Sequence, residues 1–182
     1  MKIAVLADIH GNLRALHAVC YHIDRWAPDE VLVAGDIVNR GPRSPACYDV
    51  IEERCARDGW LVVRGNHEEY VIERAAAEAP ILPQDNDVFG AVDWTRRSLG
   101  KRVANLPDLP TELRLVTSAG EIFLTHGSLL GSRDGIYPHS TDEELRKKVE
   151  LESLVFAVGP VSYTHLRAHE TRHDLVCRLL LE

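Results

Sequence analysis

The sequence predicts an α/β fold in which a parallel sheet is followed by a partly antiparallel one. Short runs of consecutive apolar residues recur along the chain, as is typical of strands buried on both faces. Segments with helical apolar spacing separate the first three runs, and two later runs flank a turn-forming segment. Strands that alternate with helices indicate parallel strands joined by right-handed crossovers, whereas two runs around a short turn indicate a hairpin.

The first half of the chain shows the alternating pattern. Asn12 is a candidate N-cap for a helix whose apolar residues share one face as far as Pro28. Ser44, which is followed by a proline, is the expected N-cap of a second helix that ends at Gly59. The expected strands are residues 3–7, 31–34 and 61–63.

The second half is expected to contain helices and a hairpin. An Ala- and Glu-rich segment and a striped segment that ends at Gly100 predict two helices. Thr141 begins a short helix with capping-box spacing. The expected elements are helices over residues 68–79 and 88–99, a proline-containing connector over 106–110, hairpin strands over 112–116 and 121–124, and a buried strand over 154–158.

Composition narrows the functional classes. A chain of 182 residues suits one globular domain with a substantial core. Its formal net charge of −7 favours neither a nucleic-acid-binding patch nor attraction to anionic membranes. With no transmembrane-length segment and no signal peptide, we expect a cytoplasmic protein whose four cysteines, lacking C-x-x-C spacing, are reduced. Its oligomeric state has no signature in the sequence.

Side chains that can ligate metals follow the predicted strands. They are Asp8 and His10, Asp36, Asn66 and His67, and His126. Loops at the carboxyl ends of strands converge on the ligand crevice of open α/β sheets. Carboxylate, amide and imidazole ligands together suit manganese, iron or zinc better than calcium. Each block alone also fits a turn or a helix cap, but their order after successive strands favours a metal site.

These blocks resemble the motifs of the calcineurin-like metallophosphoesterase superfamily. The matching segments, which span residues 3–159, are D-I-H-G-N at 8–12, G-D-I-V-N-R-G at 35–41, G-N-H-E at 65–68 and T-H-G-S at 125–128. The resemblance implies a four-layer α/β/β/α sandwich of two mixed sheets. It also implies a hydrolase of phosphodiesters or phosphomonoesters that acts on a small phosphorylated substrate.

The resemblance further implies two divalent metal ions, with manganese expected and iron, zinc or nickel as alternatives. The implied first-metal ligands are Asp8 and His10, the bridging ligand is Asp36, the second-metal ligands are Asn66 and His126, and the general acid is His67. Two adjacent cations can lower the pKa of a bridging water, so that the hydroxide attacks phosphorus without a covalent enzyme intermediate. The leaving alkoxide then needs a proton, which an imidazole can give.

Arg40 is a candidate substrate-binding residue. Its block resembles G-D-x-x-D-R-G of serine/threonine phosphatases and diadenosine tetraphosphatases, in which the arginine clamps a phosphate oxygen. A solvated loop arginine is the alternative. The residue before it is Asn39, where those families have an aspartate. We expect the amide to accept a hydrogen bond from His67 but to stabilise imidazolium poorly, which favours phosphodiesters over protein substrates.

The family's last motif, G-H-x-H, is interrupted in this sequence. Gly159 follows the predicted strand, but Pro160 and Ser162 stand where the two histidines belong. The chain therefore carries five of the seven ligands that the resemblance implies. We expect impaired activity for this reason.

The residues after Gly159 do not continue the pattern of the family. Residues 161–171 resemble a translated adaptor or assembly artefact. We therefore expect residues 1–159 to form a C-terminally truncated metallophosphoesterase domain and residues 160–182 to be a non-native tail. The alternative is a natural short variant in which one of three histidines spaced four apart, His165, His169 or His173, serves as a ligand.

Two classes of function remain open at this point. The leading one is a phosphoesterase, with a protein phosphatase or a diadenosine-tetraphosphate phosphatase as its nearest enzymatic rivals. The other is a non-catalytic scaffold, because the same fold serves that role in the retromer-type branch. Several residues are expected to have no functional part: His17, His22 and His139 on the surface, and Glu68 and Glu69 capping a helix and facing solvent.

Overall fold

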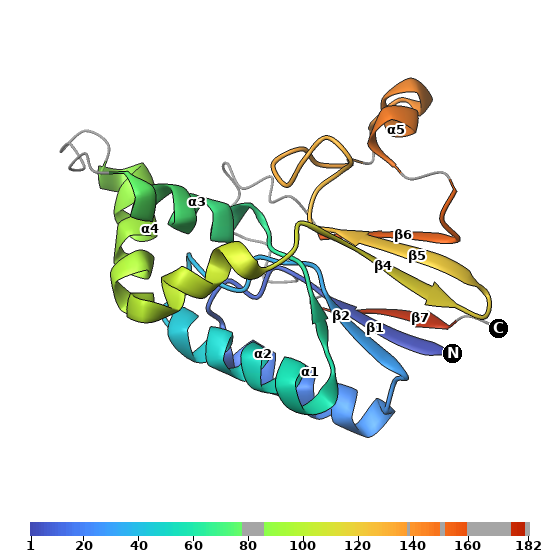
Figure 1. The fold of residues 1–182 in the computed structure, drawn as a ribbon, viewed down its shortest axis with the longest axis horizontal. Coiled ribbons are helices and arrows are strands. Elements are labelled where there is room, and N and C mark those ends of the chain that lie inside the picture. The colour runs from blue at the N-terminus through green and yellow to red at the C-terminus, as the bar shows by residue number, and fades with distance from the viewer. Residues whose placement is uncertain (78–85, 138, 150–151, 160–175, 181–182) are drawn as a thin grey trace.

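The structure is a computed structural model that describes residues 1–77, 86–137, 139–149, 152–159 and 176–180. Two β-sheets pack face to face, with helices on the outer side of the first sheet and at one end of the sandwich (Figure 1). Each sheet contains parallel and antiparallel neighbours. The predicted α/β class and the two mixed sheets are therefore confirmed.

The first sheet has the strand order β3-β2-β1-β7. Its parallel part follows the predicted strand-helix alternation, because each crossover helix returns the chain to the same end of the sheet. The elements are β1 (Lys2–Leu6), α1 (Leu13–Trp26), β2 (Glu30–Val33), α2 (Ser44–Asp58) and β3 (Leu61–Val62). The fourth strand, β7 (Val176–Leu180), pairs antiparallel with β1.

The segment expected to be a non-native tail is largely outside the described residues. Residues 160–175 and 181–182 belong to that part, and with them the alternative ligands His165, His169 and His173. Of this segment the structure describes only the backbone of β7.

The second sheet has the order β4-β5-β6. The predicted hairpin forms from β4 (Glu112–Thr117) and β5 (Gly120–Thr125), and β6 (Val155–Val158) runs parallel to β5. Helix α5 (Asp142–Lys148) begins at the predicted capping box, in which the Thr141 side chain accepts a hydrogen bond from the Glu144 N–H. This short helix has no buried residue and projects from the side of the second sheet (Figure 1).

Three further helical segments pack together at the end of the sandwich: α3 (Asn66–Ala76), α4 (Asn86–Leu99) and the 3-10 helix η2 (Gly100–Asp108). Helix α3 begins two residues before the predicted start, and residues 78 and 79 of the prediction lie outside the described part. The connector expected over residues 106–110 was wrong in part, because its first residues continue η2. Leu106 is buried there, which anchors the segment on the core.

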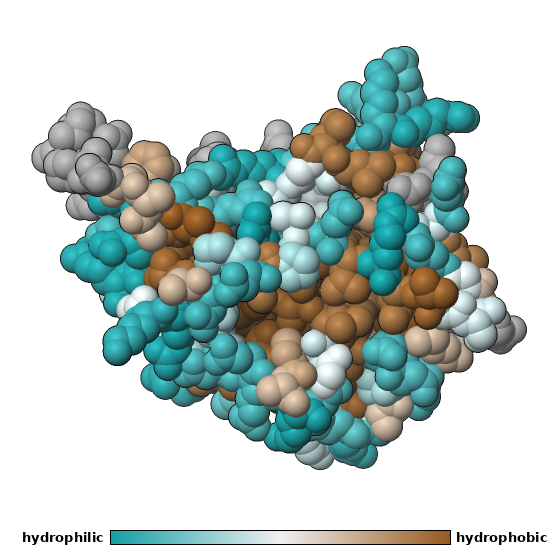
Figure 2. All heavy atoms as spheres, in the orientation of Figure 1, coloured by the Kyte–Doolittle hydropathy of each residue, from teal (hydrophilic) through white to brown (hydrophobic). Residues whose placement is uncertain are grey.

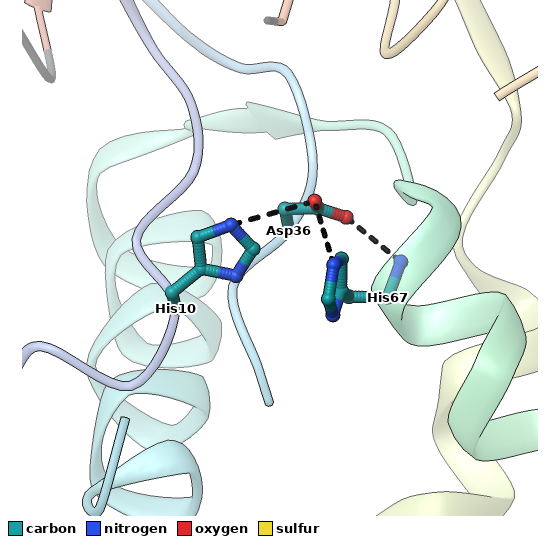
Figure 3. A group of neighbouring side chains, drawn as sticks. All are labelled: His10, Asp36 and His67. Atoms are coloured by element: carbon teal, nitrogen blue, oxygen red, sulfur yellow. Dashed lines mark hydrogen bonds and ion pairs between the residues drawn. The ribbon is translucent and has the colours of Figure 1, made fainter. Parts of the chain in front are cut away.

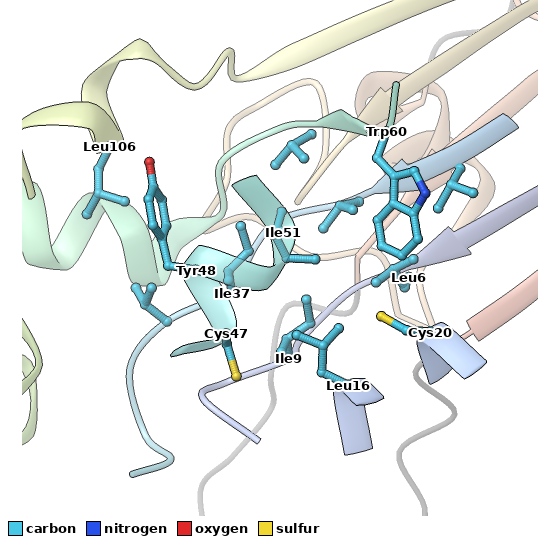
Figure 4. Packing of buried hydrophobic residues seen from close by; sticks show 14 of the residues in the cluster. Leu6, Ile9, Leu16, Cys20, Ile37, Cys47, Tyr48, Ile51, Trp60 and Leu106 are labelled. Carbon is cyan, nitrogen blue, oxygen red and sulfur yellow. The ribbon is translucent and has the colours of Figure 1, made fainter. Parts of the chain in front are cut away.

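The apolar residues form two cores. One lies between the first sheet and its helices and includes Leu6, Leu16, Ile51 and Trp60 (Figure 4). The other fills the space between the two sheets, where Val5 of β1 and Leu124 of β5 belong to one cluster. Apolar atoms are also visible on the face in Figure 2 over the strands, whereas α1 and α2 present mostly hydrophilic atoms. No described helix has the length and apolarity needed to cross a membrane.

The two predicted helix caps differ in outcome. The Asn12 side chain accepts a hydrogen bond from the Ala15 N–H at 3.1 Å, so this N-cap is confirmed. The Ser44 prediction was wrong, since Arg43 is the N-cap and Ser44 is the first helical residue. The Ser44 hydroxyl is fully buried and accepts instead from the Asn39 N–H at 3.0 Å. The Ser44 hydroxyl therefore bonds to the loop that precedes the helix and does not cap the helix.

The sequence predicts buried thiols and places His17 and His22 on the surface. The Cys177 side chain lies outside the described part of the chain. Cys20 and Cys47 are buried and Cys55 is half-buried, and all three are free. Burial raises the pKa of the Cys47 thiol to about 11. His17 and His22 are exposed on α1, as predicted.

Leu16 provides a test of the helical core. Its side chain is 1 % exposed, so Leu16→Ala leaves a cavity between α1 and the sheet. We expect the free energy of unfolding, measured by urea denaturation, to fall by about 2–5 kcal/mol. The matched control His17→Ala, one residue further along the same helix, should change it by less than about 0.5 kcal/mol. Equal effects of the two substitutions would contradict this packing.

Candidate metal centre

The loops after four strands bring the predicted ligands to one end of the sandwich. The loops after β1, β2 and β5 carry Asp8 and His10, Asp36, and His126, and the loop after β3 leads directly into α3, which begins with Asn66 and His67. These side chains come from positions far apart in the sequence, yet their polar atoms lie within a few ångströms of one another. The expectation that the strand ends converge is therefore met by the geometry.

Asp36 lies at the centre of this group (Figure 3). Its carboxylate is fully buried, and its Oδ2 atom has no hydrogen-bond partner. The Nε2 atoms of His126, His10 and His67 lie 3.4, 3.7 and 3.9 Å from that oxygen. The other oxygen, Oδ1, accepts a hydrogen bond from the backbone N–H of His67 at 2.9 Å. A buried carboxylate oxygen without a hydrogen bond is costly, so this position is suited to a cation.

The candidate ligands form two groups that share Asp36. One group is His10, Asp36 and His67, and the other is Asp8, Asp36 and His126, each with ligand atoms within 4.8 Å of one another. Asp8 Oδ2 and both ring nitrogens of His10 are also buried without hydrogen-bond partners. The donor set thus fits two neighbouring cations with Asp36 between them. The grouping differs from the one implied by the resemblance, since His67 falls among the possible ligands and Asp8 groups with His126.

His126 and Asn66 show how a cation would fit. His126 Nε2 lies 2.9 Å from Asn66 Oδ1, and His126 Nδ1 lies 2.6 Å from the Ala34 carbonyl oxygen. Since both partners are acceptors, both ring nitrogens donate in this arrangement. Burial opposes the charge, but Asp36 and the Ala34 carbonyl outweigh it and raise the pKa of His126 to about 9. The Nδ1 bond leaves Nε2 as the atom that a metal would take.

Burial and neighbouring charges also shift the pKa values of Asp36 and His67. Burial alone raises the pKa of Asp36, but the nearby imidazoles, His126 above all, outweigh it and lower that pKa. Burial lowers the pKa of His67 to about 4, with His10 and Arg40 adding to the effect. The His67 ring also meets the Tyr70 ring edge-on at a centroid distance of 5.3 Å. Tyr70, which belongs to no sequence motif, thus borders the site.

Arg40 and Asn39 flank His67. Arg40 is exposed, and its Nε–H group is directed as a donor at His67 Nε2, at 3.3 Å. Asn39 is buried, and its Oδ1 accepts from the Arg40 N–H at 2.9 Å and from the Thr95 hydroxyl at 3.2 Å. Its amide nitrogen therefore faces His67 Nδ1, at 2.8 Å, and donates to it. The expectation that the Asn39 amide accepts from this imidazole was wrong, because two other donors already occupy its oxygen.

Backbone conformation in the site is strained. Five non-glycine residues there have positive φ angles: Asp8 at 54°, His10 at 46°, Asp36 at 56°, Asn39 at 71° and Arg40 at 63°. Such residues cost on the order of 1–3 kcal/mol each and persist only where the surrounding structure holds them. The sharp turns aim the side chains into the site, so other interactions must stabilise these loops.

The position of the Glu68 side chain differs from the one predicted from the sequence. It was expected to face solvent, but it is fully buried beneath the site. Its carboxylate accepts hydrogen bonds from the N–H groups of Asp36, Ile37, Val38 and Gly65. The bond to Gly65 is the predicted cap at the start of α3. Burial and the charge of Asp36 raise the pKa of Glu68, whereas the N–H groups of Gly65, Val38 and Asp36 act in the opposite direction.

Two glycines permit close approach in the site. A Cβ on Gly65 would lie 2.1 Å from Asp36 Oδ1, and one on Gly159 would lie 2.8 Å from His126 Nδ1. A real Cβ atom cannot occupy either position without displacing a candidate ligand. The end of β6 is therefore packed directly against the metal-ligand cluster.

Comparison with known proteins identifies the family. The chain matches the family model described as calcineurin-like phosphoesterase over residues 1–175. The chain belongs to the calcineurin-like phosphoesterase family. Proteins of this family hydrolyse phosphoric esters and use divalent metals. The cluster around Asp36 lies where the family motifs fall in this sequence.

Individual relatives agree with this membership. A bis(5'-nucleosyl)-tetraphosphatase of Chromohalobacter salexigens is 35 % identical over 107 residues, which cover 53 % of this chain and 38 % of the relative. Serine/threonine-protein phosphatase 1 of Salmonella typhimurium is 27 % identical over 157 residues, which cover 84 % and 67 %. The chain spans about half the length of most of the curated relatives that it matches.

A solved structure supports the fold. A hypothetical protein from Pyrococcus horikoshii OT3 superimposes with a TM-score of 0.73 at 23 % identity, covering 88 % of this chain and 69 % of that protein.

The raised pKa of His126 predicts the pH dependence of stability in the metal-free chain. Because the folded pKa is about 9 and the usual value 6.5, protonation stabilises the fold. This contribution, about 3 kcal/mol at most, is fully present below pH 6.5 and is lost as the pH rises through 9. Urea unfolding of the EDTA-treated chain between pH 6 and 10 measures it.

His126→Asn serves as the control for this pH series. The variant lacks the titrating ring, so its stability should decline less over the same alkaline range. An identical decline in the variant and the wild type would assign the effect to other groups.

Proposed function

We propose that the chain is a metal-dependent phosphoesterase that hydrolyses phosphodiesters or phosphomonoesters of small phosphorylated molecules. The observation that carries the proposal is the buried, unpartnered Oδ2 atom of Asp36, with three imidazole nitrogens within 3.9 Å. Family membership supports the same reaction class. A buried carboxylate oxygen that accepts no hydrogen bond is costly in a purely structural role, whereas it is useful beside a cation.

Two divalent ions, for which we propose manganese, would be held by Asp8, His10, Asp36, Asn66 and His126. When bound, they would neutralise phosphate charge and activate water for attack on phosphorus. The chain's own residues would fix the ligands: Ala34 orients His126 through its carbonyl, and Asp36 sits between the two ligand groups. Iron, zinc or nickel would suit the same mixed oxygen and nitrogen donors.

Arg40 and His67 would act on the substrate. The Arg40 guanidinium is exposed beside His67 and presents a planar, positively charged set of donors, so it would bind a phosphate oxygen. A neutral imidazole has one acceptor nitrogen, and in His67 the Asn39 amide occupies it at Nδ1. The Arg40 Nε–H is also directed at His67 Nε2, but at the longer distance of 3.3 Å. We therefore propose that the ring proton lies on Nε2 and that the Arg40 guanidinium turns to the substrate phosphate, so that Nε2 would donate a hydrogen bond to the leaving oxygen.

The Asn39 contact also favours a second candidate activity. A His67 ring held with its only proton on Nε2 is a weak acid, so leaving groups that need no full proton transfer are preferred. Aryl esters and phosphoric anhydrides have such leaving groups. Hydrolysis of a dinucleoside tetraphosphate is therefore the second candidate, and the relative named as a bis(5'-nucleosyl)-tetraphosphatase is consistent with it. The Salmonella relative keeps a protein phosphatase as a further alternative.

Manganese-dependent hydrolysis of bis(p-nitrophenyl) phosphate tests the proposed function. Pro160 and Ser162 follow Gly159, which abuts His126, and stand where the family has two histidines. We expect weak turnover by the chain as it is, and an increase of about tenfold or more in the variant Pro160→His/Ser162→His, by analogy with restoring metal ligands.

Asp36→Asn in the same background is the control and should abolish turnover. A double variant that binds manganese but hydrolyses neither this diester, a nitrophenyl monoester nor a dinucleoside tetraphosphate would contradict the enzymatic proposal and favour a scaffold.

Asn39→Asp tests the proposed role of the amide. A carboxylate at this position accepts a hydrogen bond from a protonated Nδ1 and stabilises the imidazolium form of His67. Proton donation by His67 from Nε2 therefore becomes easier. In the double-histidine background, we expect turnover of alkyl phosphodiesters to rise by about tenfold or more, while that of nitrophenyl esters changes little. Similar changes for both ester classes would show that Asn39 does not control proton donation.

A further inference from the structure

One side chain joins the loop after β2 to the loop after β3. Glu68 Oε1 accepts from the N–H groups of Ile37 at 2.8 Å and Val38 at 3.1 Å. Its Oε2 accepts from Asp36 at 2.8 Å and Gly65 at 2.7 Å. Three of these donors belong to the loop that carries Asp36, and the fourth precedes Asn66 and His67. The carboxylate thus connects the two loops beneath the candidate ligands.

The chemistry of this contact requires a carboxylate. Four buried N–H donors converge on two oxygens, and each oxygen receives two of them. A glutamine would offer an acceptor at one end only and would direct its own N–H groups at two donors. An aspartate is shorter by one methylene and would not reach all four donors. Buried N–H groups left without a partner are costly, so no other side chain satisfies both loops.

The loop after β2 also needs external support. Asp36, Asn39 and Arg40 in this loop have positive φ angles, a conformation that only the surrounding structure can maintain. Glu68 bonds to the backbone of Asp36 and of the two residues after it. The two loops are in direct backbone contact as well, because a Cβ on Gly35 would lie 2.4 Å from the Gly65 nitrogen.

We infer that Glu68 is the positioning residue of the metal centre. It holds Asp36 against Asn66 and His67, so that these side chains are in place before a cation arrives. Glu68 acts through their backbones and contacts no cation itself. The inference rests on the proposed function, because metal binding by Asp36 and Asn66 is what the fixed geometry would serve.

Residue-resolved hydrogen exchange on the full, EDTA-treated chain tests, without any metal, whether Glu68 holds the two loops together. In the wild type, the amides of Asp36, Ile37, Val38 and Gly65 should be protected although they lie outside strands and regular helix. In Glu68→Gln, their exchange should accelerate by about tenfold or more. The amides of the β1–β2 pairing serve as an internal reference and should change less.

Manganese affinity, measured by isothermal titration calorimetry, tests the positioning role. Glu68→Gln should weaken Mn²⁺ binding by about 10–100-fold, as expected when a group supporting metal ligands is lost. The matched control is Glu69→Gln, which removes the same charge from the same helical turn. Glu69 is half-buried, and its carboxylate accepts from the Ser132 hydroxyl and lies 3.7 Å from Arg64 Nε, but it accepts from none of the four amides. Its variant should retain both the wild-type affinity and the protection of the four amides.

Each outcome has a clear consequence. Unprotected amides at these four positions in the wild type would overturn the inference even if Glu68→Gln failed to fold. A folded Glu68→Gln that matched Glu69→Gln in exchange and in affinity would overturn it as well. Protected amides in a wild-type chain that binds no Mn²⁺ would refute the proposed function but would support the joining of the two loops by Glu68.

Discussion

The carboxylate of Glu68 accepts four backbone hydrogen bonds in a fully buried position, and the geometry of the candidate metal centre depends on them. A parallel sheet brings the loops after β2 and β3 to the same edge, but it does not fix their conformation. The loop after β2 adopts backbone angles that are unfavourable for its residues, and the bonds to Glu68 offset that cost. A polar residue in the interior is thus what permits a strained, ligand-presenting loop.

The centre concentrates groups that a stable core would avoid. Asp36 is buried with an unpartnered oxygen, and the same environment raises the pKa of His126 and lowers that of His67. Burial and attraction to Asp36 act on both rings but with different strengths. Attraction to Asp36 outweighs burial for His126, whereas burial outweighs it for His67. Natural proteins accept such local costs mainly at functional sites, and cores elsewhere in the fold compensate for them. Here the compensation comes from two apolar clusters on either side of the first sheet.

Membership of the calcineurin-like phosphoesterase family leaves the chemistry of this chain to its own residues. The amide of Asn39 is oriented by Thr95 and by the Arg40 backbone, so it donates to His67 where a carboxylate would accept. That reversal is a local departure with consequences for proton transfer. It shifts the proposed substrates toward esters and anhydrides with weakly basic leaving groups, independently of the metal that is bound.

The order of β1 to β6 and of the α-helices, the hairpin and the candidate ligands could be predicted from the sequence, because apolar spacing and the polar residues directly after each strand are local patterns. The 3-10 helix η2 and the strand β7 were not predicted. The inward turn of Glu68, the donor role of the Asn39 amide and the burial of Ser44 could not be predicted. Each depends on partners that folding supplies: Thr95 lies 56 residues from Asn39, and the Asp36 N–H lies 32 residues from Glu68. The sequence by itself therefore determined which side chains reach the site, whereas the tertiary structure decided which hydrogen bonds they make, since donors and acceptors from distant loops compete for the same buried atoms.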